Sequence, residues 1–284
     1  MRGIRRVGAV WIPGAGAGAG WFPFQDGGVL GGEARVLQAG DAGPRYAGCM
    51  ESRLIVALDY PSAAPALELA ERLRGICRWF KVGLELYLRE GNGIVHELRR
   101  REYSVFLDLK LHDIPNTVAG AVRSVASLGA GFLTVHAAGG PAMLEAAVEA
   151  AESVPHPPEL LAVTVLTSMD QLQLAAIGVD HSPENQVLRL ADTAREAGIT
   201  GLVASAEEVG VLRRRFPDAT LVIPGIRPAG SQVADQKRVA TPAAALACGA
   251  SYLVVGRPIT QATDAAAAAQ AIVDEMQRGS TVSA

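Results

Sequence analysis

The 284-residue chain has few cysteines and no long apolar run. Its three cysteines, Cys49, Cys77 and Cys248, are widely separated and odd in number, so we expect neither a disulfide framework nor a cysteine metal cluster. Cys77 and Cys248 lie in apolar stretches and are expected to be buried. A reducing, cytoplasmic location is the default for such a chain. No stretch approaches the roughly 20 apolar residues that cross a bilayer, so we expect no membrane association.

Strong basic charge and clustered histidines are also missing. The formal net charge is −3, which argues against nucleic-acid binding because such proteins usually present a basic face. None of the five histidines is spaced with another histidine or a carboxylate in a metal-binding pattern. His112 is expected to be structural, whereas His136 is a candidate to line a site. We therefore expect no metal.

Residues 1–49 differ from the rest of the chain. They contain no lysine but many glycines, including the run PGAGAGAG at 13–20. Glycine makes ordering entropically costly, so we expect a disordered extension. A targeting or docking role is an alternative, although glycines and Pro13 interrupt the apolar core that a signal peptide needs. A translation start at Met50 is another.

From residue 53 onward, short apolar runs alternate with amphipathic segments. The runs are Leu54–Leu58, Trp79–Gly83, Val105–Leu109, Phe132–His136, Leu160–Leu166, Gly201–Ala204, Thr220–Ile223 and Tyr252–Val255. Helical segments include Ala63–Arg74, Val118–Leu128, Pro141–Ser153, Glu184–Ala197, Glu207–Phe216 and Pro242–Cys248. Most runs lack polar alternation, as in parallel strands covered on both faces. Eight such alternations predict an α/β fold, a (β/α)₈ TIM barrel over residues 50–284, with a doubly wound open sheet as the alternative.

Polar residues gather where the predicted strands end. They are Asp59, Lys81, Asp108, Lys110, His136, Thr167, Ser168, Arg227, Gly256 and Arg257. In TIM barrels the active site lies at the C-terminal ends of the strands. The distribution therefore predicts a functional site at that end.

The third predicted strand carries the densest charge. Asp108 and Lys110 are two residues apart and should share a strand face. Asp113 follows in the loop, and Lys81 on the neighbouring strand can reach the same volume. Two ammonium groups and two carboxylates would then alternate in a small space. A salt-bridge network that only stiffens the rim is the alternative, but the position at a barrel rim favours function.

The segment DLKLHDIPNT at 108–117 resembles the signature of the orotidine 5′-phosphate decarboxylase family. Further matching pieces are Ala57–Asp59, Phe80–Gly83, Leu166–Ser168, Pro224–Pro228 with Asp235-Gln236, and Val255–Thr260. Together they span roughly Arg53 to Met276 in order. The resemblance implies cofactor-free decarboxylation of orotidine 5′-phosphate to uridine 5′-phosphate and CO₂, the last step of de novo UMP biosynthesis, in a cytoplasmic homodimer.

The resemblance also implies roles for individual residues. Lys110 would protonate C6 of the pyrimidine after CO₂ leaves. Asp108 and Asp113 would flank the departing carboxylate, with Asp113 and Thr117 contributed by the partner subunit. Lys81 would link the charged groups of the array to one another and would also contact the ribose.

The remaining implied roles concern substrate binding. Asp59 would contact the ribose, and Thr167 and Ser168 would help to hold the base. The phosphate would be bound by Gly256, Arg257, Arg227 and Gln236. Residues 225–240 would form a lid that closes over it, with a passive surface loop as the alternative.

These residue types suit a decarboxylation without a cofactor. The chain has no motif for pyridoxal phosphate, thiamine or a metal, which usually stabilise such carbanions. The Lys110 ammonium can supply positive charge where negative charge develops and then deliver a proton. We therefore expect no cofactor.

Two other functions fit the same residues less well. Keto-gulonate phosphate decarboxylase and hexulose phosphate synthase, which use Mg²⁺, share the Asp-x-Lys-x-x-Asp core. The residues after Asp113, Ile114–Thr117, resemble the pyrimidine enzyme instead. A non-catalytic phosphate-binding barrel would be expected to lack one of the four charges, and all four are present.

Overall fold

The computed structural model describes residues 9–11, 21–23, 53–228 and 240–280. The chain divides into two units, Met1–Ala42 and Gly43–Ala284. In the first unit, strands β1 (Ala9–Trp11) and β2 (Trp21–Pro23) pair antiparallel. The glycine-rich sequence did not predict this pair. The disorder expected for the rest of the extension concerns residues outside the described ranges.

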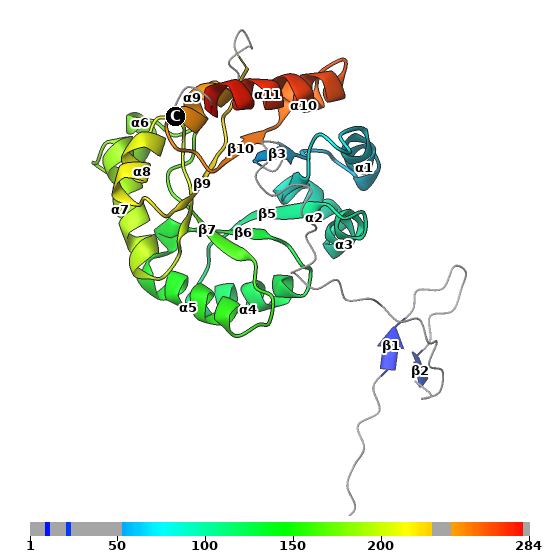
Figure 1. Cartoon of the computed structure of the whole chain (residues 1–284). Coiled ribbons are helices and arrows are strands. Elements are labelled where there is room, and N and C mark those ends of the chain that lie inside the picture. Colours follow the sequence, from blue (N-terminus) through cyan, green and yellow to red (C-terminus); the bar gives the residue numbers. More distant parts are fainter. Residues whose placement is uncertain (1–8, 12–20, 24–52, 229–239, 281–284) are drawn as a thin grey trace, which may run out of the picture. The chain divides into compact units, whose positions relative to one another are not determined.

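The second unit contains a closed barrel of parallel strands (Figure 1), with the order β10-β3-β4-β5-β6-β7-β8-β9. The strands are β3 (Leu54–Ala57), β4 (Trp79–Gly83), β5 (Ser104–Leu111), β6 (Phe132–His136), β7 (Glu159–Val163), β8 (Gly201–Val203), β9 (Thr220–Ile223) and β10 (Tyr252–Val255). Because β10 pairs with both β9 and β3, the sheet has no edge. The TIM-barrel prediction is confirmed, and the open sheet is excluded.

Two strand boundaries differ from the predicted ones in ways that matter for the site. β5 extends to Leu111 rather than Leu109, so Lys110 belongs to the strand. β7 ends at Val163 rather than Leu166. Thr167 and Ser168 therefore lie in the loop that follows the strand.

Helices surround the barrel (Figure 1). They are α1 (Ala63–Arg72), α2 (Leu84–Glu90), α3 (Asn92–Arg100), α4 (Pro115–Ala126), the 3₁₀ turn η2 (Ala137–Gly139), α5 (Pro141–Glu152), α6 (Gln171–Ala176), α7 (Pro183–Glu196), α8 (Val209–Arg215), α9 (Pro242–Ala247), α10 (Arg257–Thr260) and α11 (Ala265–Ser280). Proline opens α4, α5, α7 and α9, a position where its missing N–H costs nothing. Among the described helices, none is long and apolar enough to cross a membrane.

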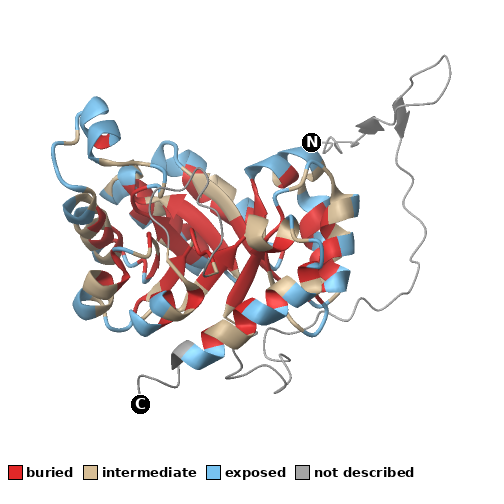
Figure 2. Ribbon diagram, turned by 90° about the horizontal axis from the view of Figure 1, so that it is seen from above, coloured by how far each residue is buried: buried red, intermediate tan, exposed pale blue. Residues whose placement is uncertain are grey.

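Burial follows the two layers of the barrel (Figure 2). The strands are almost wholly buried, whereas the helices bury one face and expose the other. Most of the core lies between strands and helices. Cys77 belongs to that core, but Cys248 is exposed at the end of α9, so its predicted burial is wrong.

A smaller cluster fills the inside of the barrel at the N-terminal ends of the strands. Trp79, Phe132 and Tyr252 are the first residues of β4, β6 and β10. The Trp79 and Phe132 rings stack with centroids 4.4 Å apart, and Tyr252 meets the Phe132 ring edge-on at 5.1 Å. These rings occupy the N-terminal end of the barrel interior, which leaves the opposite end for a cavity.

Candidate active site

A cavity of about 590 Å³ opens at the C-terminal ends of the strands, a size within the usual range for small-molecule sites. Nine of the predicted site residues line it: Asp59, Lys81, Asp108, Lys110, Thr167, Ser168, Arg227, Gly256 and Arg257. Apolar side chains, including Phe106, Val163 and Val254, form much of the remaining wall. These nine residues, predicted from strand ends far apart in the sequence, therefore meet around one cavity.

Strand register brings the acidic and basic residues together. Lys81 on β4 pairs with Ala57 at the end of β3, two residues before Asp59. Gly83, two residues after Lys81, pairs with Asp108 on β5. A Cβ atom at position 83 would lie 2.8 Å from Nζ of Lys81. Glycine at this position thus leaves room for the ammonium group between the two carboxylates.

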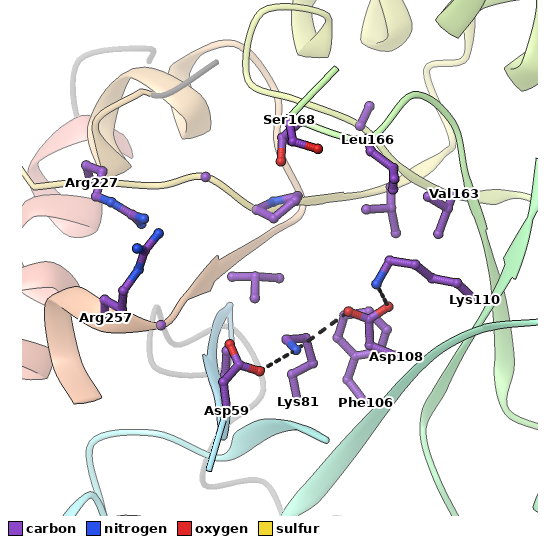
Figure 3. Close-up of a pocket in the computed structure, with 18 of the residues that line it drawn as sticks. Asp59, Lys81, Phe106, Asp108, Lys110, Val163, Leu166, Ser168, Arg227 and Arg257 are labelled. Carbon is purple, nitrogen blue, oxygen red and sulfur yellow. Dashed lines mark hydrogen bonds and ion pairs between the residues drawn. The ribbon is translucent and has the colours of Figure 1, made fainter. Parts of the chain in front are cut away.

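Asp59, Lys81, Asp108 and Lys110 form a continuous chain of alternating charge (Figure 3), so its second carboxylate is Asp59 and not the predicted Asp113. Nζ of Lys81 lies 3.0 Å from Oδ1 of Asp59 and 3.6 Å from Oδ2 of Asp108. Nζ of Lys110 lies 2.7 Å from Oδ1 of Asp108. Asp108 and Lys81 are only 14% and 12% exposed, whereas Lys110 is 33% exposed. Of the two lysines, Lys110 is therefore the one whose ammonium group is more accessible to a ligand.

The buried carboxylate of Asp108 remains ionised. Burial by itself raises the pKa of this group, but the charges of Lys81 and Lys110 oppose that effect. Hydrogen bonds from Lys110 and Thr134 lower the pKa further, so that it lies below its ordinary value. Asp108 is thus charged at neutral pH, and the array of which it is part borders a cavity.

The backbone at Lys110 departs from regular strand geometry. Its φ is +48°, a region that non-glycine residues seldom occupy. The register of β5 with β6 shifts between Leu107 and Leu111. Lys110 therefore lies in a bulge, although its side chain shares the predicted face with Asp108.

Thr134 on β6 supports this bulge and was missed by the sequence analysis. The backbone N–H of Lys110 donates to Oγ1 of Thr134 at 2.8 Å, and that hydroxyl donates to Oδ1 of Asp108 at 3.2 Å. The available signal was a single threonine inside the apolar run Phe132–Val135. A buried threonine in a strand is common, so the signal alone did not mark a site residue.

Two arginines lie at the other side of the cavity from Lys110. Arg227 and Arg257 direct their guanidinium groups toward one another (Figure 3). Arg257 is the first residue of α10, and Arg227 is largely buried, with Nη1 donating to the carbonyl oxygen of Ile226 at 2.9 Å. Paired guanidinium groups suit an anion such as a phosphate, because their planar donors match its oxygens.

Ile226 and Arg227, before the predicted lid, lie beside Ala240, which follows it. The backbone N–H of Arg227 donates to the carbonyl oxygen of Ala240 at 2.9 Å, which ties the two ends together beside the arginines. Gln236 and most of the predicted lid, residues 229–239, lie outside the described residues.

Asp113 and Thr117 are exposed and do not line this cavity. Oδ1 of Asp113 accepts the backbone N–H of Ile114 at 2.6 Å. Asp113 instead borders a shallow hollow with His112, near the start of α4.

The His112 ring stacks on His136, with centroids 5.3 Å apart. Burial, His112 and Lys110 together lower the pKa of His136, but neither histidine lines the cavity.

Comparison with known proteins assigns the chain to a family. The family described as "Orotidine 5'-phosphate decarboxylase / HUMPS family" matches residues 52–272. The chain belongs to this family. Proteins named orotidine 5'-phosphate decarboxylase from Halorhodospira halophila and Pseudomonas aeruginosa are 53% and 51% identical to it. These alignments cover 79% and 80% of this chain and 95% and 98% of the relatives.

Solved structures agree with this family assignment. The orotidine 5'-phosphate decarboxylase of Lactobacillus acidophilus superposes with a TM-score of 0.70 and 38% identity. The superposition covers 79% of this chain and 99% of that one. An uncharacterized conserved protein from Geobacillus kaustophilus gives a TM-score of 0.69 with 36% identity, covering 78% of this chain and 99% of its own. The family's barrel is thus present in full in this chain.

Proposed function

We propose that this protein decarboxylates orotidine 5′-phosphate to uridine 5′-phosphate and CO₂, as the final step of UMP synthesis. The main support for the proposal is the way charged side chains are distributed around the cavity, in a chain that belongs to this family. The ammonium of Lys110 stands beside Asp108 on one side, and two guanidinium groups stand on the other. A nucleotide that has a carboxylated base and a 5′-phosphate matches this distribution.

In the proposed reaction the bond between C6 and the carboxylate carbon breaks. CO₂ leaves, and the electron pair of that bond remains on C6 as a carbanion. The ammonium of Lys110 stabilises the developing charge and then transfers a proton to C6. The neutral lysine regains its proton from solvent, so the reaction consumes one proton and needs no oxidant or reductant.

Asp108 and Lys81 act on Lys110. The carboxylate of Asp108 is 2.7 Å from Nζ of Lys110, and this charge-assisted hydrogen bond fixes the direction of the ammonium group. Lys81 bridges Asp108 to Asp59, so that the buried carboxylate keeps a partner when Lys110 gives up its proton. We assign Lys81 and Asp59 to the ribose as well.

The phosphate supplies binding energy at a distance from the bond that breaks. We assign it to Arg227, Arg257, the backbone of Gly256, and Gln236. Thr167 and Ser168 hold the base. Binding energy from the phosphate contacts can raise the rate of decarboxylation as well as the affinity for the substrate.

We further propose that the enzyme is a cytoplasmic homodimer in which Asp113 and Thr117 complete the partner's site. Both residues are exposed and lie just beyond the strand that carries Lys110. The apolar side chain of Ile114, next to Asp113 in the chain, is 67% exposed. Such a surface is suited to burial against a second copy.

The activity is tested by incubating purified protein with orotidine 5′-phosphate in excess EDTA and following uridine 5′-phosphate by chromatography. We expect rapid turnover that added Mg²⁺ does not change. A parallel assay supplies sugar phosphates and Mg²⁺. Turnover there, with none of orotidine 5′-phosphate, would assign the protein to the Mg²⁺-dependent branch, whereas a folded protein inactive in both would be a silent barrel.

We propose that residues 50–284 contain the whole decarboxylase and that residues 1–49 are a separate extension. A variant that starts at Met50 is expected to keep kcat and KM within about twofold and to keep its oligomeric state, because the cavity is built from residues of the barrel unit. Steady-state kinetics and light scattering check this. A lower kcat or altered assembly would instead give the extension a functional role.

A further inference from the structure

Thr134 lies in β6, one strand away from the residues that carry the charge, and does not line the cavity. We infer that Thr134 is a positioning residue that fixes both Lys110 and Asp108 in their working geometry. The inference rests on the proposed decarboxylation. Its side chain has no exposed surface, so it acts through its neighbours and not on the substrate.

The direction of its hydrogen bonds is determined by the chemistry of its partners. The backbone N–H of Lys110 can only donate, so Oγ1 of Thr134 accepts it at 2.8 Å. The ionised carboxylate of Asp108 can only accept, so the same hydroxyl donates to Oδ1 at 3.2 Å. Oδ1 also accepts from Nζ of Lys110. One hydroxyl thus closes a ring through the backbone and the side chain of Lys110.

The strand register explains why a side chain is needed at this point. Leu107 pairs with Leu133, and Leu111 pairs with Val135. Three residues of β5 therefore stand opposite the single residue Thr134. The bulge places Lys110 at φ +48° and turns its N–H to a side chain in place of a strand carbonyl. An unusual backbone conformation of this kind persists only where its surroundings hold it.

Loss of the hydroxyl would affect both partners at once. The N–H of Lys110 would lose its acceptor, so the bulge could relax toward regular strand geometry and move the ammonium away from Asp108. Asp108 would lose one of the hydrogen bonds that lower its pKa. Displacement of a proton donor by about 1 Å lowers catalytic rates by about 10²-fold.

A purely structural role for Thr134 makes a different prediction. In that case the substitution would lower stability without a specific effect on turnover. Thr164 provides a matched control, because its buried hydroxyl also bonds to backbone, donating to the carbonyl oxygen of Val203 at 2.9 Å. It lies just beyond β7 and does not line the cavity.

The test compares Thr134→Val, Thr134→Ser and Thr164→Val with the wild type in kcat, KM and thermal unfolding. Valine keeps the shape and removes the hydroxyl, whereas serine keeps the hydroxyl. We expect Thr134→Val to lower kcat by about 10²-fold with KM within about threefold. Thr134→Ser and Thr164→Val should stay within about threefold of the wild-type kcat. If Thr134→Val does not fold, Thr134→Ala takes its place.

A second measurement does not depend on activity. The chain contains only three lysines, Lys81, Lys110 and Lys237, so protein labelled with ¹³C-lysine gives three ε-methylene signals that Lys→Arg variants assign. The Lys110 signal should shift in Thr134→Val and stay in place in Thr164→Val. An unshifted signal, or equal kcat in the two valine variants, would overturn the inference. Inactive wild-type protein would reject the proposed function alone, since the lysine signals still report on Thr134.

Discussion

Replacing Lys110 by alanine is expected to lower kcat for orotidine 5′-phosphate by about 10⁴-fold or more. Two contributions are lost together. A fixed charge at the position where negative charge develops accounts for about 10²–10³-fold in other enzymes. Proton transfer from a positioned acid accounts for about 10²–10⁴-fold. Steady-state kinetics with quenched samples measures the loss.

The same substitution has a limited structural cost. Lys110 is 33% exposed, and Asp108 keeps Lys81 at 3.6 Å as a partner after the change. The thermal unfolding midpoint should therefore move by a few degrees at most, and the affinity for uridine 5′-phosphate should persist. This separates a lost chemical group from a collapsed site.

Lys110→Arg distinguishes the two contributions. Arginine keeps a positive charge but holds its proton far more strongly than lysine. We expect this variant to remain much slower than the wild type, because the charge is retained while proton delivery to C6 is not. A Lys110→Ala protein that retained more than about a tenth of the wild-type kcat would remove Lys110 from the proposed mechanism.

The charge array could be predicted from sequence because strand periodicity determines it. Asp108 and Lys110 are two residues apart, and the neighbouring strand brings Lys81 alongside. Only three lysines occur in the whole chain, and two of them lie in this array. Nearly all other cations of the chain are arginine, so the position of a lysine was in itself a signal for the site that the strand pattern did not use.

The supporting residues could not be predicted in the same way. Thr134 contacts Lys110 only because β5 bulges, and the bulge depends on the register between two strands rather than on local periodicity. The end of β7 was also predicted three residues too late, since Thr164, Val165 and Leu166 continue a strand-like apolar pattern beyond Val163. Asp113 was expected in the charge array from its place just after the strand, and Thr117 was assigned through resemblance, but within one chain both lie outside the cavity.

Mixing two inactive variants, Lys110→Ala and Asp113→Ala, is expected to restore activity. If each site combines Lys110 of one subunit with Asp113 of its partner, a mixed dimer contains one site with both residues intact. Random exchange makes half of the dimers mixed, and each has one working site of two. The mixture should therefore reach about one quarter of the wild-type activity, from a background near zero.

A reciprocal mixture provides the control. Wild-type protein mixed equally with the Lys110→Ala, Asp113→Ala double variant has no intact site in its mixed dimers when sites are shared. Activity should then fall to about one quarter of the all-wild-type value, whereas sites confined to one chain would leave about one half. Subunit exchange is verified beforehand with a mass-tagged copy. If the first mixture stays inactive and the second retains one half, Asp113 does not act across an interface, and its exposed position beside α4 needs another explanation.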